Sequence, residues 1–309
     1  MERFEPIIKA VDKEKIKSEL TRDKFFKPTN NGGNEIYIVT AHDSPNVMQE
    51  IGRLREVSFR DAGGGTKKST DIDSYDTSEK PFKQLLVWNP VDEEITGGYR
   101  FCCGKDMMLD DTGKPLSPTS ALFNISEKFI TSYLPTTFEL GRSFVQPKYQ
   151  PAYDLRKGFY SLDNLWDGLG ALIMTYPDME YFFGKITMYP RYNITARDMI
   201  LYFLDRYFPD HENLLTPRPE IKIEIVTDPA EFEVMFTGNN YEENYRILQK
   251  NVKRFNEQVP PLVAAYMNLS STMRTFGTAR NHNFGGVEET GILINIFDIY
   301  DFKKERHVQ

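Results

Sequence analysis

The chain has 309 residues, of which 40% are hydrophobic and 13% aromatic, enough for a substantial core in one large domain or two ordinary ones. Its net charge of −7 argues against nucleic acid as the main partner, because phosphate binding needs a concentrated positive field. No stretch approaches the roughly 20 apolar residues that span a bilayer, and the first residues lack the apolar run of a signal peptide, so we expect a cytoplasmic protein.

The N-terminal part predicts a polar arm followed by a strand and a helix. Residues 1–34 form the arm, with a short helix over about 12–20, and a β-branched and aromatic run predicts a strand over 36–40. Asp43-Ser-Pro-Asn marks a helix start, with an N-cap candidate and proline at the first helical position.

The remainder of the chain continues this alternation. Strands are predicted over 84–88, 95–101, 137–145, 181–188 and 291–299, and helices over about 162–173, 195–208 and 241–255, with one more opened by the prolines at 260 and 261. We therefore expect a mixed α/β protein with an arm (1–34), a core (35–210) and an extension (211–309) that packs on the core and contributes to the same domain.

The strand predicted over 137–145 contains Glu139-Leu-Gly-Arg142. In a regular strand Glu139 and Arg142 would face opposite sides of the sheet, because side chains alternate. Gly141 tolerates a bulge, which could bring both charges to one side and leave backbone groups unpaired for a ligand. An ordinary ion pair on an edge strand explains the fragment equally well.

A candidate phosphate site follows that strand at Arg156-Lys157-Gly158. Helix N-termini favour anions through free N–H groups and the macrodipole, Ser161 could cap the next helix, and two cations add to the field. A plain turn is the other interpretation, since neither the Walker nor the dinucleotide-binding glycine motif is present.

The sequence predicts no disulfide, no metal site and no covalent nucleophile. Cys102 and Cys103 are adjacent, which is poor geometry for a bridge and the wrong spacing for a zinc knuckle. The four histidines are scattered and lack HExxH spacing. Asp73 and Asp76 lie in a polar loop and could bind a metal or orient a basic group, but such charged loops are usually just solvated.

Four motifs occur in order along the chain: Arg55-Glu-Val-Ser-Phe59, Asp73-Ser-Tyr-Asp76, Gly98-Tyr-Arg100 and Glu139-Leu-Gly-Arg142. Together they resemble the N-acyltransferases of the GNAT superfamily that use acyl carrier protein, namely acyl-homoserine-lactone synthases and, more closely, the hemolysin-like ornithine- and glycine-lipid synthases. Later blocks at 165–169, 183–188 and 260–269 are similar to the lipid-synthase branch. The resemblance implies a GNAT-like, mostly antiparallel central sheet flanked by helices, with a C-terminal helical extension.

The resemblance also implies roles for individual residues. Glu139 would draw a proton from the attacking amine, which is needed because an ammonium group cannot attack a thioester. Arg142 would pair with Glu139, and Arg100, Asp73 and Asp76 would hold the site together or orient the acceptor.

The substrate pockets are implied in the same way. Arg55, Phe59, Asp73 and Asp76 would form the acceptor and acyl pocket, backbone N–H groups near Phe144 and Val145 would stabilise the oxyanion, and Arg156, Lys157 and Gly158 would hold the donor phosphate.

The reaction implied by the resemblance moves a fatty acyl group from an acyl carrier protein thioester to the amine of a small amino acid, as in glycine- or ornithine-type N-acyl lipid synthesis. Two alternatives stay open: an N-acetyltransferase that uses acetyl-CoA, and a non-catalytic GNAT-fold protein that binds an acyl metabolite. The acyl thioester would be a co-substrate, with no bound cofactor. The expected partners are acyl carrier protein and the amino acid, with at most transient contact at the inner membrane face.

Overall fold

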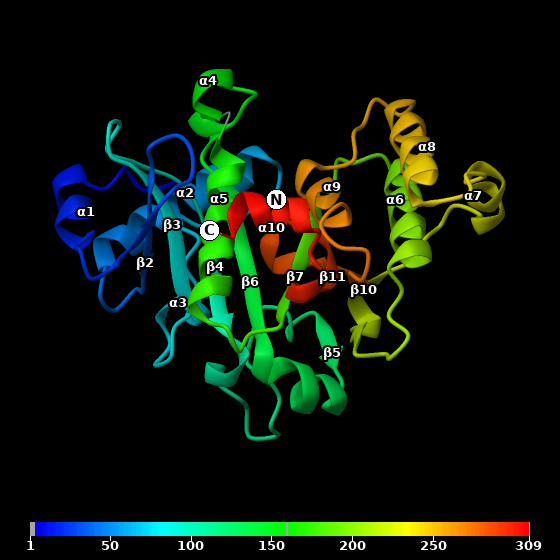
Figure 1. Ribbon diagram of the computed structural model, residues 1–309, viewed down its shortest axis with the longest axis horizontal. Helices are drawn as coiled ribbons and strands as arrows, with labels where there is room; N and C mark the ends of the chain where they lie inside the picture. The colour runs from blue at the N-terminus through cyan, green and yellow to red at the C-terminus, as the bar shows by residue number, and fades with distance from the viewer. Residues whose placement is uncertain (1–3, 159, 309) are drawn as a thin grey trace.

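The structure is a computed structural model that describes residues 4–158 and 160–308, apart from the side chains of Arg156 and Lys157. Its centre is a nine-stranded sheet with helices packed on both faces, and a second sheet has two strands (Figure 1). The predicted fold class is confirmed: mixed α/β, with a mostly antiparallel sheet flanked by helices.

The strands of the large sheet are β1 (Phe25–Pro28), β2 (Glu35–Val39), β3 (Lys83–Asn89), β4 (Glu94–Cys103), β6 (Thr137–Val145), β7 (Tyr181–Met188), β9 (Lys222–Ile223), β10 (Arg274–Asn281) and β11 (Val287–Asn295). Their order across the sheet is β1-β2-β3-β4-β6-β7-β11-β10-β9. Neighbouring strands are antiparallel, with the exception of the parallel pair β6 and β7. The small sheet pairs β5 (Phe123–Ile125) with β8 (Leu215–Pro217).

The α-helices are α1 (Lys13–Glu19), α2 (Pro45–Asp61), α3 (Ser74–Thr77), α4 (Leu155–Gly158), α5 (Ser161–Thr175), α6 (Ile194–Tyr207), α7 (Pro229–Met235), α8 (Tyr241–Lys253), α9 (Pro261–Met267) and α10 (Asp301–His307). Helix α2 begins as predicted, with Pro45 in its first turn after Ser44. Among the described residues, every helix is too short or too polar to cross a lipid bilayer.

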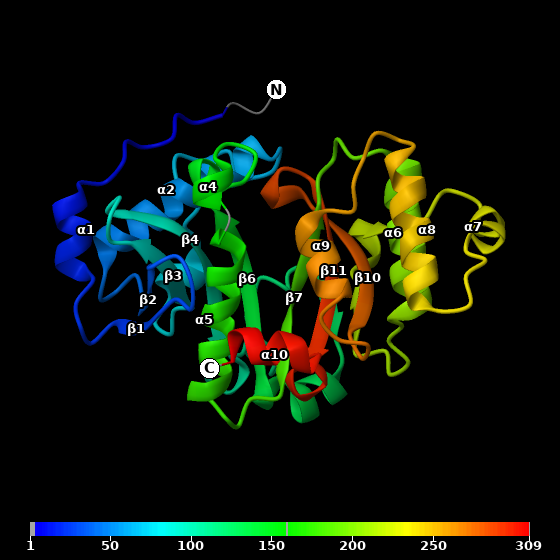
Figure 2. The ribbon, with the colours of Figure 1, turned by 45° about the horizontal axis from the view of Figure 1, so that its top comes forward.

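Each face of the sheet has its own core. Helices α5, α6, α8 and α9 bury their apolar sides against one face, where Phe138 and Leu140 of β6 lie. Helices α1 and α2 pack on the opposite face with Phe144 of the same strand. Figure 2 shows α5 in front of the sheet and α2 behind it. The site described below lies between these two layers.

A bulge in β6 explains why Phe144 faces the core opposite to that of Phe138 and Leu140. The register with β4 shifts between Gly98 and Arg100, so that two residues of β6 lie opposite one of β4. The strained residue is Arg142, with a φ of 49°, whereas Gly141 keeps an ordinary φ. The predicted bulge is therefore present, but the unusual backbone belongs to the arginine.

The parallel strands β6 and β7 pair only at their first residues. Thr137, Phe138 and Glu139 lie beside Tyr181, Phe182 and Phe183, and no further pairs follow. Beyond Glu139 the edge of β6 that faces β7 has no strand partner among the described residues. The predicted unpaired backbone is therefore present on this edge.

The C-terminal third contributes strands as well as helices. Strand β11 pairs with β7 along its whole length, and β10 and β9 extend the sheet beyond it. The sequence pattern predicted one closing strand over 291–299 and missed β10, whose Gly277 has a φ of 75° in an irregular stretch. This region is therefore partly helical, as predicted, and partly made of strands of the large sheet.

Candidate active site

A cavity of about 370 Å³ opens where β6 and β7 separate. Toward α5 and α9 its wall is apolar and includes Tyr99, Leu140, Leu162, Leu165, Phe182, Leu262, Tyr266, Ile292 and Ile294. Toward α2 and α3 it is polar and includes Arg100, Glu139, Arg142, Lys185, Thr187 and Glu289. The cavity therefore joins an apolar compartment to a charged one through a gap in the sheet.

Glu139 lies in the polar wall and is only 2% exposed. Its Oε1 accepts two hydrogen bonds from Thr119, one from the hydroxyl at 2.7 Å and one from the backbone N–H at 3.2 Å. Its Oε2 has no hydrogen-bond partner among the described residues. One oxygen is thus held in place, and the other is available to a group in the cavity.

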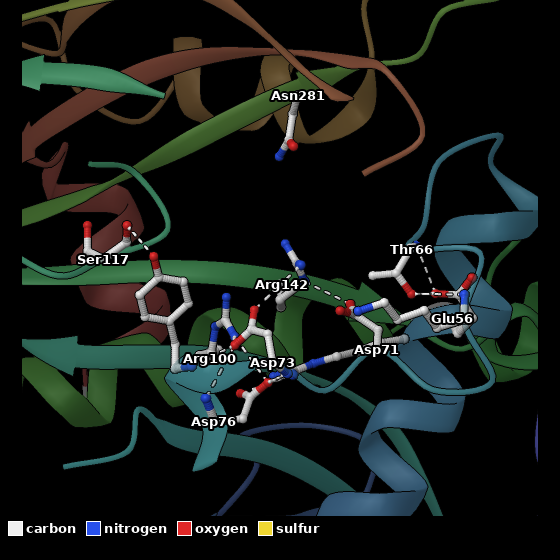
Figure 3. A network of polar contacts seen from close by, with 12 residues as sticks. Glu56, Thr66, Asp71, Asp73, Asp76, Arg100, Ser117, Arg142 and Asn281 are labelled. Carbon is white, nitrogen blue, oxygen red and sulfur yellow. Dashed lines mark hydrogen bonds and ion pairs between the residues drawn. The ribbon is translucent and has the colours of Figure 1, made fainter. Parts of the chain in front are cut away.

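Arg142 lines the same cavity but does not pair with Glu139, so the predicted ion pair is wrong. Its Nε donates to Asp71 Oδ2 at 2.7 Å, and its guanidinium lies over the Phe284 ring at 4.2 Å from the centroid. Figure 3 shows this pairing, with Asn281 across the gap from Arg142. The bulge brings Arg142 to the side of Glu139, and the loop before α3 supplies its partner.

Arg100 is held from behind by the two acids of the predicted loop. Its Nη1 lies 2.7 Å from Asp73 Oδ1 and 3.1 Å from Asp76 Oδ2 (Figure 3). Asp76 also accepts from Arg55, 3.3 Å away, and from the side-chain amide of Gln84 at 3.0 Å. The buried charges thus form one connected group that joins α2, α3, β3 and β4.

Burial and charge act in opposite directions on this group. Burial would raise the pKa of Asp76, but the charges of Arg55 and Arg100 hold it below its ordinary value. For Arg55, burial lowers the pKa by more than the nearby charge of Asp76 raises it, so the pKa is lowered. For Arg100, the charges of Asp76 and Asp73 together raise the pKa by more than burial lowers it, so the pKa is raised. The carboxylate of Asp76 is therefore ionised at neutral pH and fixes Arg100 at the cavity wall.

Arg55 does not line the cavity, contrary to the expectation that it forms part of the acceptor pocket. It is fully buried behind the wall, where it supports Asp76, and Asp76 is likewise fully buried. Phe59 does line the cavity, and its ring contacts Phe284 edge to face at 5.0 Å between centroids. These contacts assign Arg55 and Asp76 to holding the site rather than to touching a substrate.

Phe144 and Val145 also line the cavity, at the end of β6. The carbonyl of Val145 accepts a hydrogen bond from Gln150 at 2.7 Å, which fixes the end of the strand. The strand edge that these residues occupy is the one that separates from β7. Its unpaired backbone lies next to the apolar compartment.

The predicted phosphate segment is a single helical turn, α4, rather than an open loop. The side chains of Arg156 and Lys157 lie outside the described residues. Gly158 packs so closely that a Cβ there would come within 2.4 Å of the Pro151 nitrogen. Packing therefore accounts for this glycine.

The buried thiol near the site is poorly suited to nucleophilic attack. Burial and the neighbouring Glu139 raise the pKa of Cys102 to about 12. A thiol must lose its proton to act as a nucleophile, so Cys102 stays unreactive at neutral pH. The predicted absence of a covalent nucleophile rests on the sequence, and this pKa is consistent with it.

Comparison with known proteins identifies the family. A model of the acetyltransferase (GNAT) domain matches residues 54–156. A protein of Bacteroides thetaiotaomicron named glycine N(alpha)-acyltransferase is 53% identical over 306 residues, which are 99% of this chain and 90% of that protein. The chain belongs to the GNAT family of N-acyltransferases. It is therefore an enzyme, as the motifs predicted.

A second relative supports the assignment of this N-acyltransferase. The glycine N(alpha)-acyltransferase of Phocaeicola vulgatus is also 53% identical, over 99% of this chain and 93% of that protein. The solved structure of AAC(6')-Ib in complex with ribostamycin and coenzyme A covers 86% of this chain and 94% of that one, with 9% identity and a TM-score of 0.33. That likeness is too remote to support an argument about function.

The sequence analysis missed three polar residues of the site: Thr119, Lys185 and Glu289. Thr119 lies in the stretch between β4 and β6, which had no assignment. Lys185 lies within the block at 183–188 that carried part of the resemblance. Burial and the neighbouring Glu289 raise the pKa of the cavity residue Tyr189 to about 12. A charged residue inside an otherwise apolar strand is the signal that could have found Lys185, whereas Glu289 stands between Glu288 and Thr290 and gives no such signal.

Proposed function

We propose that the enzyme transfers a long acyl group from an acyl carrier protein thioester to the α-amine of glycine. The observation that carries the proposal is the cavity between β6 and β7, in which Glu139 lies at the junction of an apolar and a charged compartment. The name of the two relatives supports glycine as the acceptor. The volume of the cavity, about 370 Å³, and its apolar wall favour a long acyl chain over acetyl.

In this proposal Glu139 is the base for the acceptor. Oε2 takes a proton from the ammonium of glycine, and the free amine attacks the thioester carbonyl. The N–C bond forms and the C–S bond breaks. The attacking nitrogen loses a second proton as the amide forms; one proton passes to the departing thiolate to give the thiol, and the other is released to solvent, which returns Glu139 to its carboxylate. Backbone N–H groups near Phe144 and Val145 stabilise the negative oxygen of the tetrahedral intermediate.

The donor arm follows the unpaired edge of β6 toward α4 and the start of α5. Arg156, Lys157 and Gly158 lie there in the chain, and the N-terminal N–H groups of α5 favour an anion. This keeps the donor phosphate on the apolar side of the sheet, with the acceptor on the charged side. An acyl carrier protein and coenzyme A carry the same phosphopantetheine arm, so both are donors to be compared.

The test is an acyl-transfer assay on the purified full-length enzyme, read by mass spectrometry. Palmitoyl carrier protein, palmitoyl-CoA and acetyl-CoA are each offered with glycine, ornithine, alanine and serine. The proposal predicts N-palmitoylglycine as the main product, formed fastest from the carrier protein. Transfer only from acetyl-CoA would instead support a short-chain acetyltransferase, and preference for ornithine would refute glycine as the acceptor.

We also propose that contact with the membrane is transient and occurs at the inner face. The product has one acyl chain and is amphipathic, so it leaves most easily near a bilayer. Cells expressing the protein are fractionated at moderate salt, and most of the protein is expected in the supernatant. Recovery in a membrane pellet that resists a salt wash would contradict this proposal.

A further inference from the structure

Three cations line the cavity among the described residues, and two of them already have carboxylate partners. Arg100 pairs with Asp73 at 2.7 Å, and Arg142 pairs with Asp71 at the same distance. The third cation, Lys185, has no carboxylate within ion-pair distance among the described residues. Lys185 is therefore the cation in the wall that can bind an anion without breaking an existing pair.

Among the described residues, the Lys185 ammonium makes one hydrogen bond, which connects it to the proposed base. Its Nζ donates to the Thr119 hydroxyl at 3.1 Å, and that hydroxyl donates to Glu139 Oε1 at 2.7 Å. The two bonds in series place Lys185 Nζ within about 6 Å of Glu139 Oε1. One small polar molecule can span this distance. The nearest other acid of this wall, Glu289, accepts from Asn281 at 2.8 Å.

The strand register places Lys185 and Glu139 on the same face of the sheet. Glu139 is opposite Phe183, so Lys185 is two residues further along β7 and points to the same side. At Gly141, the next residue of β6 on this face, nothing lies within 4 Å of the position of a Cβ. On the other side of β7, Lys185 is opposite Gly291. At Gly291 the rings of Phe123 and Phe276 come within 3.3 Å of the position of a Cβ, so the room beside the lysine lies on the Gly141 side.

We propose that Lys185 binds the carboxylate of the acceptor amino acid. A carboxylate in a partly buried cavity needs a cationic donor, because otherwise its desolvation is not compensated. In an α-amino acid one carbon separates carboxylate and amine, so a carboxylate on Lys185 leaves the amine beside Glu139. The proposal rests on the proposed function and explains how the enzyme distinguishes amino acids from simple amines.

The test compares glycine with glycinamide, which lacks the negative charge, in the parent enzyme and in Lys185→Met. Methionine keeps the length of the side chain and removes the charge. The parent is expected to prefer glycine in kcat/KM, and the variant to lose about 10- to 100-fold with glycine, the range for one charged hydrogen bond. The loss is expected mainly in KM, with glycinamide almost unaffected. Lys185→Arg is expected to restore part of the preference.

A matched control is Lys83→Met, which removes a half-buried lysine of β3 that contacts Tyr176 and lies outside the cavity wall. It is expected to leave the ratio of glycine to glycinamide unchanged. If Lys185→Met lowers both acceptors equally, the lysine only positions Thr119 and Glu139, and the proposal is refuted. An unchanged ratio with unchanged rates refutes it as well.

Binding of glycine and glycinamide, measured by ligand-observed NMR without donor, separates this proposal from the proposed function. If the parent acylates no amine but binds glycine better than glycinamide only when Lys185 is present, the carboxylate site stands and the proposed reaction fails. If the parent acylates glycine while Lys185→Met keeps the preference in binding and in rate, the reaction stands and the site is elsewhere.

Discussion

Thr119 and Glu139 show how much of the chemistry depends on single side chains. Both hydrogen bonds from Thr119 reach the same oxygen, Oε1, so the carboxylate is oriented rather than merely neutralised. The hydroxyl comes from a segment that has no regular structure at this point. A base held in this way needs no reorganisation when the acceptor arrives.

Replacing Glu139 with glutamine is expected to lower kcat by about 10²-fold while the protein stays folded. Glutamine keeps an Oε1 that accepts from Thr119, so only the proton acceptor is lost. The measurement is a steady-state rate together with a thermal melt. Glu289→Gln is the matched control, since it changes the other buried carboxylate of the cavity. A loss confined to Glu289→Gln would assign the proton transfer to that residue.

Replacing Arg142 with alanine is expected to destabilise the fold by about 3 kcal/mol, because it leaves the buried carboxylate of Asp71 without its cation. Urea unfolding measures this loss. The double variant Arg142→Ala, Asp71→Asn is expected to recover part of the stability, since the uncompensated charge is then gone. If the single variant lost less than about 1 kcal/mol, the pair of Arg142 and Asp71 would contribute little to the stability of the fold.

At the scale of elements, the buried polar group connects the helices α2 and α3 to the paired strands β3 and β4. Arg55 comes from α2, Asp76 from α3, Gln84 from β3 and Arg100 from β4. Asp73 and Asp76 also cap α3 reciprocally, each side chain accepting from the backbone of the other. The short helix is therefore held to the sheet at its N-terminus, where it supports Arg100.

The depressed pKa of Asp76 predicts a loss of stability in acid. The folded protein holds this pKa below its ordinary value of 3.8, so the unfolded chain binds more protons as the pH falls through that range. Stability from this carboxylate is therefore complete at neutral pH and decreases below about pH 4. Urea midpoints at pH 6, 4 and 3 are expected to fall less steeply for Asp76→Asn than for the parent.

The control for the urea midpoints of Asp76→Asn is Asp111→Asn, because Asp111 is exposed on the surface and is not part of the buried charged group. Its midpoints are expected to follow those of the parent at each pH. The same slope for Asp76→Asn and the parent would mean that other carboxylates cause the acid sensitivity.

At the scale of the whole molecule, one buried acid joins the beginning, the middle and the end of the chain. Asp167 of α5 accepts from the backbone and side-chain N–H groups of Asn30, each at 3.0 Å, and lies 2.8 Å from His307 Nδ1 of α10. Close packing reinforces this contact, since a Cβ at Gly170 would meet the His307 carbonyl at 2.0 Å. Helix α10 is thereby fixed on α5, as Figure 2 shows.

Replacing Asp167 with alanine is expected to cost about 2–4 kcal/mol, because it leaves the buried ring of His307 and the partly buried N–H groups of Asn30 without this acceptor. The control Asp163→Ala lies one turn earlier on the same helix and removes an exposed pair with Arg306. An exposed pair contributes less than about 1 kcal/mol. Urea unfolding of both variants is the measurement. Equal effects would show that the buried junction contributes no more than a surface ion pair.

Local pattern was sufficient for most of the sheet and for the family. The strands β6 and β7 have the predicted bounds. The signal that predicts them, a run of β-branched and aromatic residues between turn residues, depends only on near neighbours in the sequence. The four motifs that contain Arg55, Asp73, Arg100 and Glu139, in that order along the chain, indicated an N-acyltransferase through their resemblance to the family. Strand β10 was not predicted, because its register is irregular and its Gly277 has a positive φ.

The partners of the charged residues were decided by the tertiary structure alone. Arg142 pairs with Asp71, 71 residues away, although Glu139 is three residues away, because the bulge and the loop before α3 bring Asp71 to the guanidinium. Thr119 hydrogen-bonds to Glu139 from 20 residues away, and Lys185 donates to Thr119 from 66 residues away. Sequence distance carries no information on such contacts, since they depend on how the packed elements place side chains in space.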